Sequence, residues 1–250
     1  MSLGAGLRSY LNRSASYIQQ EASNALKLDG FSSWKKDLPM FQLNSVEALE
    51  QFVLGCDADI GGQSEAYWGH TPSNTGLFWG KLDTKVPEGS KFEHSGYAGI
   101  KSKERPFTLF HHPRFDASQF RYLAIRCKAD SRQYFVNLQT DSIYPSYTWQ
   151  HRLQAETPGE WEVVMIPFRD FILTAHGHVQ KNQLELDRTK IRNVGLSIMR
   201  QDGEFSLELD WIRAVNTERT LGDRDILPTE RGANQKSAPF FVDFPKKGGN

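Results

Sequence analysis

The stretch YLAIRCKA at residues 122–129 decides the fold class, because apolar and polar side chains alternate along it. Leu123, Ile125, Cys127 and Ala129 fall on one side, and the basic residues between them fall on the other. A period of two is typical of a β-strand with one buried and one exposed face. The stretch therefore predicts a half-buried strand.

The same alternation returns along the chain, with turn residues such as Pro158-Gly159 and Asp202-Gly203 between the runs. It predicts strands at residues 133–139, 147–153, 161–165, 194–198 and 205–211, and further strands at 76–82, 97–103 and 107–110. Many short strands separated by turns predict an all-β antiparallel sandwich or barrel. A parallel sheet would need helical crossovers, and only residues 170–192 form a connection of that length.

Composition narrows the function classes. The chain has 250 residues, with 30 basic and 30 acidic side chains and a formal net charge of zero. A nucleic-acid-binding protein usually carries a basic excess, so we expect no nucleic-acid partner. Cys56 and Cys127 are too few for a disulfide framework, and we interpret both as small buried hydrophobes. No apolar run approaches the roughly 18 residues that span a bilayer.

The chain divides into three parts. Residues 1–28 contain an imperfect helical stripe together with Arg8 and Arg13, and two interpretations stay open: a targeting segment, or an amphipathic helix packed on the domain. Residues 40–216 form the predicted sandwich, with a brief helix near its start that Asn44 would cap. Residues 217–250 form a polar extension. Within it, Phe240–Phe244 is apolar enough that we expect it to dock on this chain or on a partner.

Catalytic motifs are missing from the sequence: we find no nucleophile elbow, phosphate-binding loop or zinc-protease motif. The neighbouring pairs His111-His112 and His176-x-His178 provide too few ligands for a metal ion. Asp57 and Asp59 are interpreted as turn-capping residues rather than Ca²⁺ ligands. We therefore predict no enzyme activity, no metal site and no cofactor.

Aromatic residues offer the only candidate binding site. Most of them should lie in the core, but some can line an open face of the sandwich, where aromatic rings hold sugars or protein partners. The candidates are Tyr144, Tyr147, Trp149 and His151. They support an alternative function as a carbohydrate- or small-ligand-binding module.

Six short motifs occur in series, and together they resemble the complex I intermediate-associated protein 30 family. They are DIGGQS at 59–64, SGYAGI at 95–100, GEW at 159–161, IPFRDF at 166–171, QDGEF at 201–205 and LELDWI at 207–212. The resemblance covers about residues 49–214. After Phe171 the chain departs from the family's pattern, with His176-Gly177-His178 in place of a Pro followed by Arg-Gly.

The resemblance implies a fold and a function. The implied fold is a jelly-roll sandwich like that of galactose-binding and family-11 carbohydrate-binding modules. The implied function is that of a non-enzymatic mitochondrial chaperone for respiratory complex I, acting on membrane-arm intermediates alongside other assembly factors. The implied location is the matrix, with peripheral contact to the inner membrane, and the N-terminal arm would serve for targeting or for that contact.

The motif residues are expected to have structural roles. Their glycines suit tight turns or close backbone approach, Pro167 should end a strand, and Trp161 and Trp211 should be core residues. The full set is Gly61, Gly62, Ser64, Ser95, Gly96, Gly99, Trp161, Pro167, Phe168, Phe171, Asp210 and Trp211.

Overall fold

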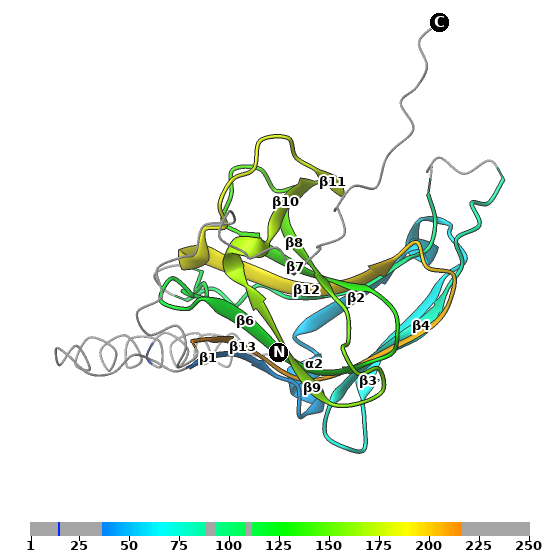
Figure 1. Cartoon of the computed structure of the whole chain (residues 1–250), viewed down its shortest axis with the longest axis horizontal. Coiled ribbons are helices and arrows are strands. Elements are labelled where there is room, and N and C mark those ends of the chain that lie inside the picture. The colour runs from blue at the N-terminus through cyan, green and yellow to red at the C-terminus, as the bar shows by residue number, and fades with distance from the viewer. Residues whose placement is uncertain (1–14, 16–36, 89–93, 109–111, 217–250) are drawn as a thin grey trace, which may run out of the picture. The chain divides into compact units, whose positions relative to one another are not determined.

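The computed structural model describes residues 15, 37–88, 94–108 and 112–216. Their strands form two antiparallel sheets that stack face to face as a β-sandwich (Figure 1). The predicted antiparallel all-β fold is confirmed. The predicted N-terminal arm (Ala15 excepted), the C-terminal extension with Phe240–Phe244, and His111 lie outside the described residues.

Sheet A has strand order β3-β4-β13-β6-β9, and β1 also pairs with β13. Its strands are β1 (Asp37–Gln42), β3 (Glu65–His70), β4 (Gly76–Leu82), β6 (Tyr122–Ala129), β9 (Glu162–Pro167) and β13 (Gly203–Val215). The long β13 pairs with β4 over residues 203–209 and with β1 over residues 211–215, and it pairs with β6 on its other side. A bulge between Leu209 and Trp211 separates these halves.

Sheet B has strand order β11-β10-β8-β7-β12-β5-β2. Its strands are β2 (Phe52–Cys56), β5 (Tyr97–Ser102), β7 (Tyr134–Thr140), β8 (Tyr147–Leu153), β10 (Ile172–Ala175), β11 (His178–Val179) and β12 (Ile191–Met199). In Figure 1 this sheet forms the upper layer and sheet A the lower one.

The alternation located most strands correctly, because β4 to β9, β12 and β13 coincide with predicted runs within a few residues. Five strands were not predicted: β1, β2, β3, β10 and β11. Of these, β10 and β11 are short, with four and two residues, and β2 and β3 each contain a glycine, which weakens a strand pattern. The strand predicted at 107–110 is absent at its described positions, Phe107 and Thr108.

The brief helix near the start of the domain is α2 (Val46–Leu49). Its N-cap is Ser45, whose hydroxyl oxygen accepts a hydrogen bond from the backbone N–H of Ala48 at 3.3 Å. The prediction of Asn44 as the cap was therefore wrong by one residue. Three single 3₁₀ turns complete the described helices: η1 (Asp57–Ile60), η2 (Phe168–Asp170) and η3 (Arg188–Lys190).

The core lies between the two sheets. Leu123, Ile125 and Cys127 of β6 face Val194, Leu196 and Ile198 of β12 within one cluster of buried side chains, all fully or almost fully shielded from solvent. Burying such side chains stabilises the fold by about 1.5–3 kcal/mol each. The predicted inward faces of these two strands are confirmed.

Candidate functional site

A buried carboxylate joins the two sheets. Asp57 opens η1, which leads from β2 of sheet B to β3 of sheet A, and it is 3% exposed. Its Oδ2 accepts hydrogen bonds from the Ser95 hydroxyl at 2.7 Å and from the backbone N–H of Gly96 at 2.5 Å. Ser64 donates twice, from its N–H to Oδ1 and from its hydroxyl to Oδ2, both at 3.1 Å. Asp57 thus ties together two sequence motifs that lie far apart in the chain.

Two glycines make this arrangement possible. A Cβ atom on Gly62 would collide with the carboxyl group of Asp57, so the chain can pass this close only without a side chain. Gly96 adopts φ +82°, in the left-handed region that favours glycine, and its N–H donates to the carboxylate. The motif residues 61–64 and 95–96 therefore serve the sandwich itself. From the sequence, Asp57 was predicted only to cap a turn. The signal that could have indicated its wider role is an acidic residue shortly before a pair of glycines.

Hydrogen bonding decides the charge state of this carboxyl. Burial by itself would raise the pKa of Asp57, but the donors on Ser95, Gly96 and Ser64 outweigh it and lower the pKa below its ordinary value. Asp57 is therefore a carboxylate at neutral pH with all its near donors directed at it. Because protein donors already bind its oxygens, this carboxylate is suited to a structural role.

Several other motif residues also have structural roles, in the core, at the end of a strand or within sheet A. Phe168 and Phe171 are buried and stack with ring centroids 6.3 Å apart, and β9 ends at Pro167. Asp210, at the bulge of β13, accepts a hydrogen bond from the side chain of Gln42 at 3.0 Å and pairs with Arg126. These contacts bind β1 and β6 to the middle of sheet A.

The predicted binding residues do not form one open platform. Tyr147, Trp149 and His151 alternate along β8 on the side that faces the core. Trp149 is 4% exposed, and its indole N–H donates to the backbone carbonyl of Leu184 at 3.0 Å. Tyr144 is exposed and lies 4.7 Å from Tyr147 between ring centroids. A ligand role for this group therefore stays a prediction, with Tyr144 as its accessible member.

His151 is half-buried and packs near Phe171, with ring centroids 5.7 Å apart. Burial lowers its pKa, against the smaller opposing effects of the Arg152 carbonyl and Asp170. The ring is therefore largely neutral at physiological pH. This is the behaviour of a packed side chain at the rim of the core.

Strand β9 presents an unexpected face. Its residues Val164 and Ile166 point to the core, so Val163 and Met165 point outward, as does Trp161 just before the strand. These three side chains are 37%, 48% and 39% exposed. The prediction that Trp161 is a core residue was wrong, because this segment is apolar on both faces and alternation alone cannot choose between them.

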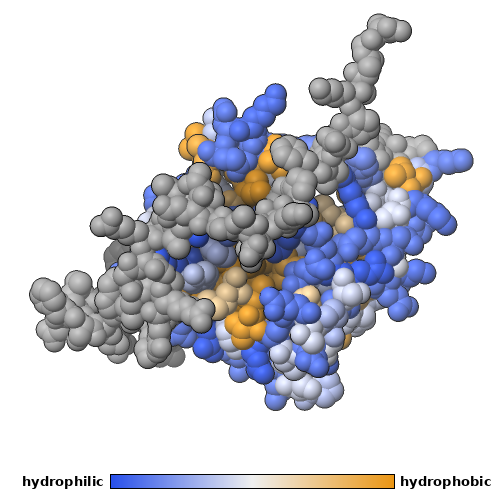
Figure 2. Space-filling model, in the orientation of Figure 1, coloured by the Kyte–Doolittle hydropathy of each residue, from blue (hydrophilic) through white to orange (hydrophobic). Residues whose placement is uncertain are grey.

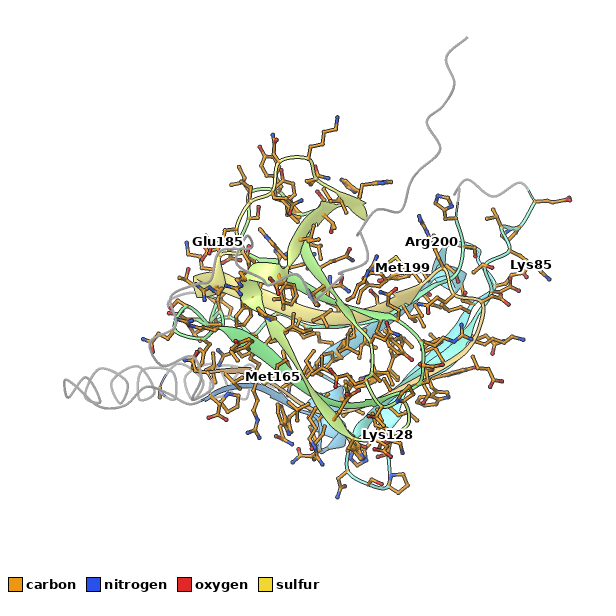
Figure 3. The ribbon with its side chains drawn as sticks, in the orientation of Figure 1. Lys85, Lys128, Met165, Glu185, Met199 and Arg200 are labelled. Atoms are coloured by element: carbon orange, nitrogen blue, oxygen red, sulfur yellow. The ribbon has the colours of Figure 1, made fainter. Side chains whose placement is uncertain are left out.

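More aromatic residues share the outer side of sheet A. Tyr67 and Trp79 stack at 5.5 Å between ring centroids at the β3–β4 end of the sheet. Trp211 is half-buried on the same side, so its prediction as a core residue was also wrong. We call these residues the aromatic face: Tyr67, Trp79, Trp161, Val163, Met165 and Trp211. Figure 2 shows hydrophobic residues at the surface over β9, and Figure 3 labels Met165 there.

Arginines lie over the tryptophans of this face. The guanidinium carbon of Arg126 is 5.1 Å from the ring centroid of Trp161, and that of Arg213 is 4.5 Å from the ring centroid of Trp211. Arg126 also pairs with Asp210, and Arg213 pairs with Asp37 at 3.2 Å. These two arginines are therefore paired with carboxylates. The apolar side chains on this side of the sheet are the groups that a partner protein could contact.

The residues that the structure describes contain neither a metal-ligand cluster nor a membrane-spanning helix. Among residues 37–88, 94–108 and 112–216, no three His, Cys, Asp or Glu side chains gather closely enough to hold a metal ion. His176 takes φ +50° in the turn between β10 and β11, while His178 lies in β11. Within the same described ranges, no helix has the length and apolar character needed to cross a membrane.

Comparisons with known proteins agree with this architecture. The family 11 carbohydrate-binding module of a Clostridium thermocellum cellulase, Lic26A-Cel5E, matches with a TM-score of 0.51 and 12% identity, over 72% of this chain and 95% of that chain. At that identity the likeness shows the fold alone.

Sequence relatives are more informative. A Neurospora crassa protein named complex I intermediate-associated protein 30, mitochondrial, is 28% identical over 234 residues, covering 84% of each chain. A Drosophila melanogaster protein of the same name is 26% identical over 180 residues, covering 69% of this chain and 61% of that one. A sequence model of the family matches residues 41–209, from the end of β1 to the middle of β13. This chain belongs to the complex I intermediate-associated protein 30 family.

Proposed function

We propose that this protein is a non-enzymatic assembly factor for mitochondrial respiratory complex I, acting from the matrix side on intermediates of the membrane arm. The observation that carries the proposal is the family match over residues 41–209, which includes strands of both sheets and the Asp57 region. Relatives in several animals and a fungus are named for association with complex I intermediates and for mitochondria.

The aromatic face is our candidate for the docking surface. Interfaces are enriched in Trp, Tyr, Met and Arg, and a few such residues usually carry most of the binding energy. A strand that is apolar on both faces is normally covered on both. On β9 the outer apolar set is open, while the inner set is covered by the core. We infer that a partner protein covers the outer set.

The edge of sheet A offers a second means of contact. β9 pairs with β6 on one side, and none of the described strands pairs with its other side. An edge strand can accept an extended segment of another protein through backbone hydrogen bonds. Side-chain contacts to Val163 and Met165 would then add specificity to that pairing.

Deleting the gene in a species that has complex I tests the function, with native gels to resolve the respiratory complexes. We expect membrane-arm intermediates to accumulate and mature complex I to fall. Normal complex I in the deletion strain would overturn the assembly role. Complementation with Val163→Glu then tests the docking face, and we expect it to restore assembly poorly and to lose co-purifying subunits.

The matched control is Val53→Glu, because Val53 is 50% exposed on β2 of sheet B. It places the same charge at a similarly exposed valine away from the aromatic face. Restored assembly by both variants would place the docking surface elsewhere on the molecule. Peripheral contact with the inner membrane stays a prediction, and flotation of the protein with vesicles of inner-membrane lipid tests it.

A further inference from the structure

We propose that the open edge of β9 pairs with the same edge of a second copy of this chain, so that sheet A continues across a two-fold axis into the sheet A of that copy. β9 lies at the edge of sheet A, where it pairs with β6 and with no other described strand (Figure 1). An edge strand with unpaired backbone groups is a template for pairing with another chain. The proposal concerns self-association, and it does not depend on the assembly role.

The strand pairing shows which backbone groups of β9 are available. Phe168, directly after β9, donates its N–H to the carbonyl of Arg121 at 3.0 Å, and this contact continues the register of the β6–β9 pair. In an antiparallel pair, positions that bond to the neighbouring strand alternate with positions that do not. Counting back from Phe168, the N–H and C=O groups of Val163 and Met165 therefore point away from β6, to the open edge. Pro167 also faces that edge, but proline has no N–H to donate.

The other edges of the described sheets are less suited to such pairing. β11 has only two residues, and β1 is interrupted by Pro39 and a register shift. At the β2 edge, the N–H of Cys56 is bound by the carboxylate of Asp59 at 3.1 Å. α2 lies beside β3, where the indole N–H of Trp68 donates to the carbonyl of Leu49 at 3.1 Å. Short strands, prolines, bulges and covering elements protect sheet edges, and β9 has none of these before its final residue.

One antiparallel register uses all the open groups of the strand. It places Val163 opposite Met165 of the second copy and Met165 opposite Val163 of that copy, so Val164 lies opposite its own counterpart. Each opposed pair of Val163 and Met165 can exchange two backbone hydrogen bonds. Because the register is the same when the copies are interchanged, it satisfies the two-fold symmetry that most homodimers have.

The outward side chains in this register match one another. Val163 meets Met165 of the second copy, and Trp161 meets Pro167, so every outward pair is uncharged. Val163 and Met165 are 48% and 39% exposed in the single chain. Apolar cross-strand pairs of this kind stabilise a sheet. Pairing with a second copy therefore gives exposed apolar side chains of β9 apolar neighbours.

The charged residue of β9 is also compatible with this register. Glu162 would lie opposite Ile166 of the second copy, so the Glu162 carboxylates of the two copies do not face each other. Each Glu162 carboxylate accepts a hydrogen bond from the backbone N–H of Glu156 in its own chain, at 3.1 Å. Like charges placed directly opposite each other would weaken the pairing, and this register avoids them.

The joined sheet would change the surface that other proteins meet. Side chains of opposed residues lie on the same face of a sheet, so the aromatic faces of the two copies would border on each other. An extended segment of another protein could then use the β9 edge only by replacing the second copy.

Sedimentation velocity of the full-length protein, between about 2 and 500 µM, tests the self-association. An edge-to-edge contact is small, so we expect a weak dimer with a dissociation constant on the order of 10–100 µM. Met165→Pro removes an open N–H and should weaken the dimer by about tenfold or more. The matched control Met165→Ala keeps that N–H and should weaken it less. A monomer at every concentration overturns the proposal, and so does a dimer that a folded Met165→Pro variant leaves unchanged.

Disulfide cross-linking tests the register and does not require Met165→Pro to fold. Opposed residues at a non-hydrogen-bonded position have Cα atoms about 4.5 Å apart, within the range that a disulfide spans. In a Cys56→Ser background, Val164→Cys should cross-link two copies at least about threefold faster than Val163→Cys, although Val163 is the more exposed residue. Equal rates, or a faster reaction of Val163→Cys, overturn the β9 pairing. Complex I assembly is measured separately in the deletion strain and is unaffected by either result.

Discussion

The Oδ2 atom of Asp57 lies 2.7 Å from the hydroxyl oxygen of Ser95, although the two residues are 38 positions apart in the chain. This contact joins the turn after β2 to the residue preceding Gly96 and β5. Ser64, the residue before β3, completes the arrangement, so one carboxylate fixes the point where the chain passes between the sheets.

Replacing Asp57 by Asn should destabilise the fold by about 3 kcal/mol, because an amide N–H₂ would face donors that now bind an oxygen. Urea unfolding followed by tryptophan fluorescence measures the change. Asp116→Asn is the control: it keeps the acceptor for the Ser118 N–H on an exposed turn and should cost less than about 1 kcal/mol. Equal losses in the two variants would contradict the structural role of Asp57.

Asp57 also predicts a pH dependence. Its folded pKa lies below its ordinary value of 3.8, so the unfolded chain binds a proton more readily than the folded one. The corresponding stability is complete well above pH 3.8 and is lost as the pH falls through 3.8 toward the lowered folded pKa. Melting temperatures between neutral and strongly acidic pH measure this. Asp57→Asn should show a smaller acid-induced fall than the unsubstituted protein, and identical slopes would count against the assignment.

Replacing each of two adjacent glycines by alanine should lower the stability of the fold by different amounts. Gly62→Ala places a Cβ against the Asp57 carboxyl group and should cost roughly 2–4 kcal/mol, because the carboxylate must leave its donors. Gly61 has φ +97° and open space around it, so Gly61→Ala should cost only the left-handed strain of about 1–2 kcal/mol. Chemical denaturation compares the pair. A larger loss at Gly61 would refute the packing argument.

Polar substitutions on the two faces of β9 should lower the stability of the fold by different amounts. Val163→Ser changes an exposed position and should alter stability by less than about 0.5 kcal/mol. Ile166→Ser, at a position 1% exposed, should cost more than about 3 kcal/mol because it leaves a cavity and a buried hydroxyl. Thermal unfolding of both variants decides which face points inward. Similar losses would mean that the assigned orientation of β9 is wrong.

The two thiols should differ in accessibility. Cys127 is fully buried in the core, and burial, with a smaller contribution from Glu162, raises its pKa to about 12. It should resist a thiol reagent at pH 8 in the folded protein, because the reactive thiolate is scarce and shielded. Cys56 is half-buried. We expect one reacting thiol in the native protein and two in urea, and Cys56→Ser should leave none in the native protein.

Local alternation was enough to determine the fold class and most strands. In β6 and β12 only one face is apolar, so period two identifies the core side, as Leu123 and Val194 show. The motif series likewise indicated the family. These properties are carried by residues close together in the chain, which is why they can be read without a structure.

Tertiary structure alone decided the rest. Both faces of β9 are apolar, so only packing against sheet B shows that Ile166 is buried and Met165 open. The contact of Asp57 with Ser95 and that of Asn137 with Ser197 join residues that are 38 and 60 positions apart in the sequence. Such relationships depend on strand order and register, which are set by long-range packing and hydrogen bonding rather than by any local pattern.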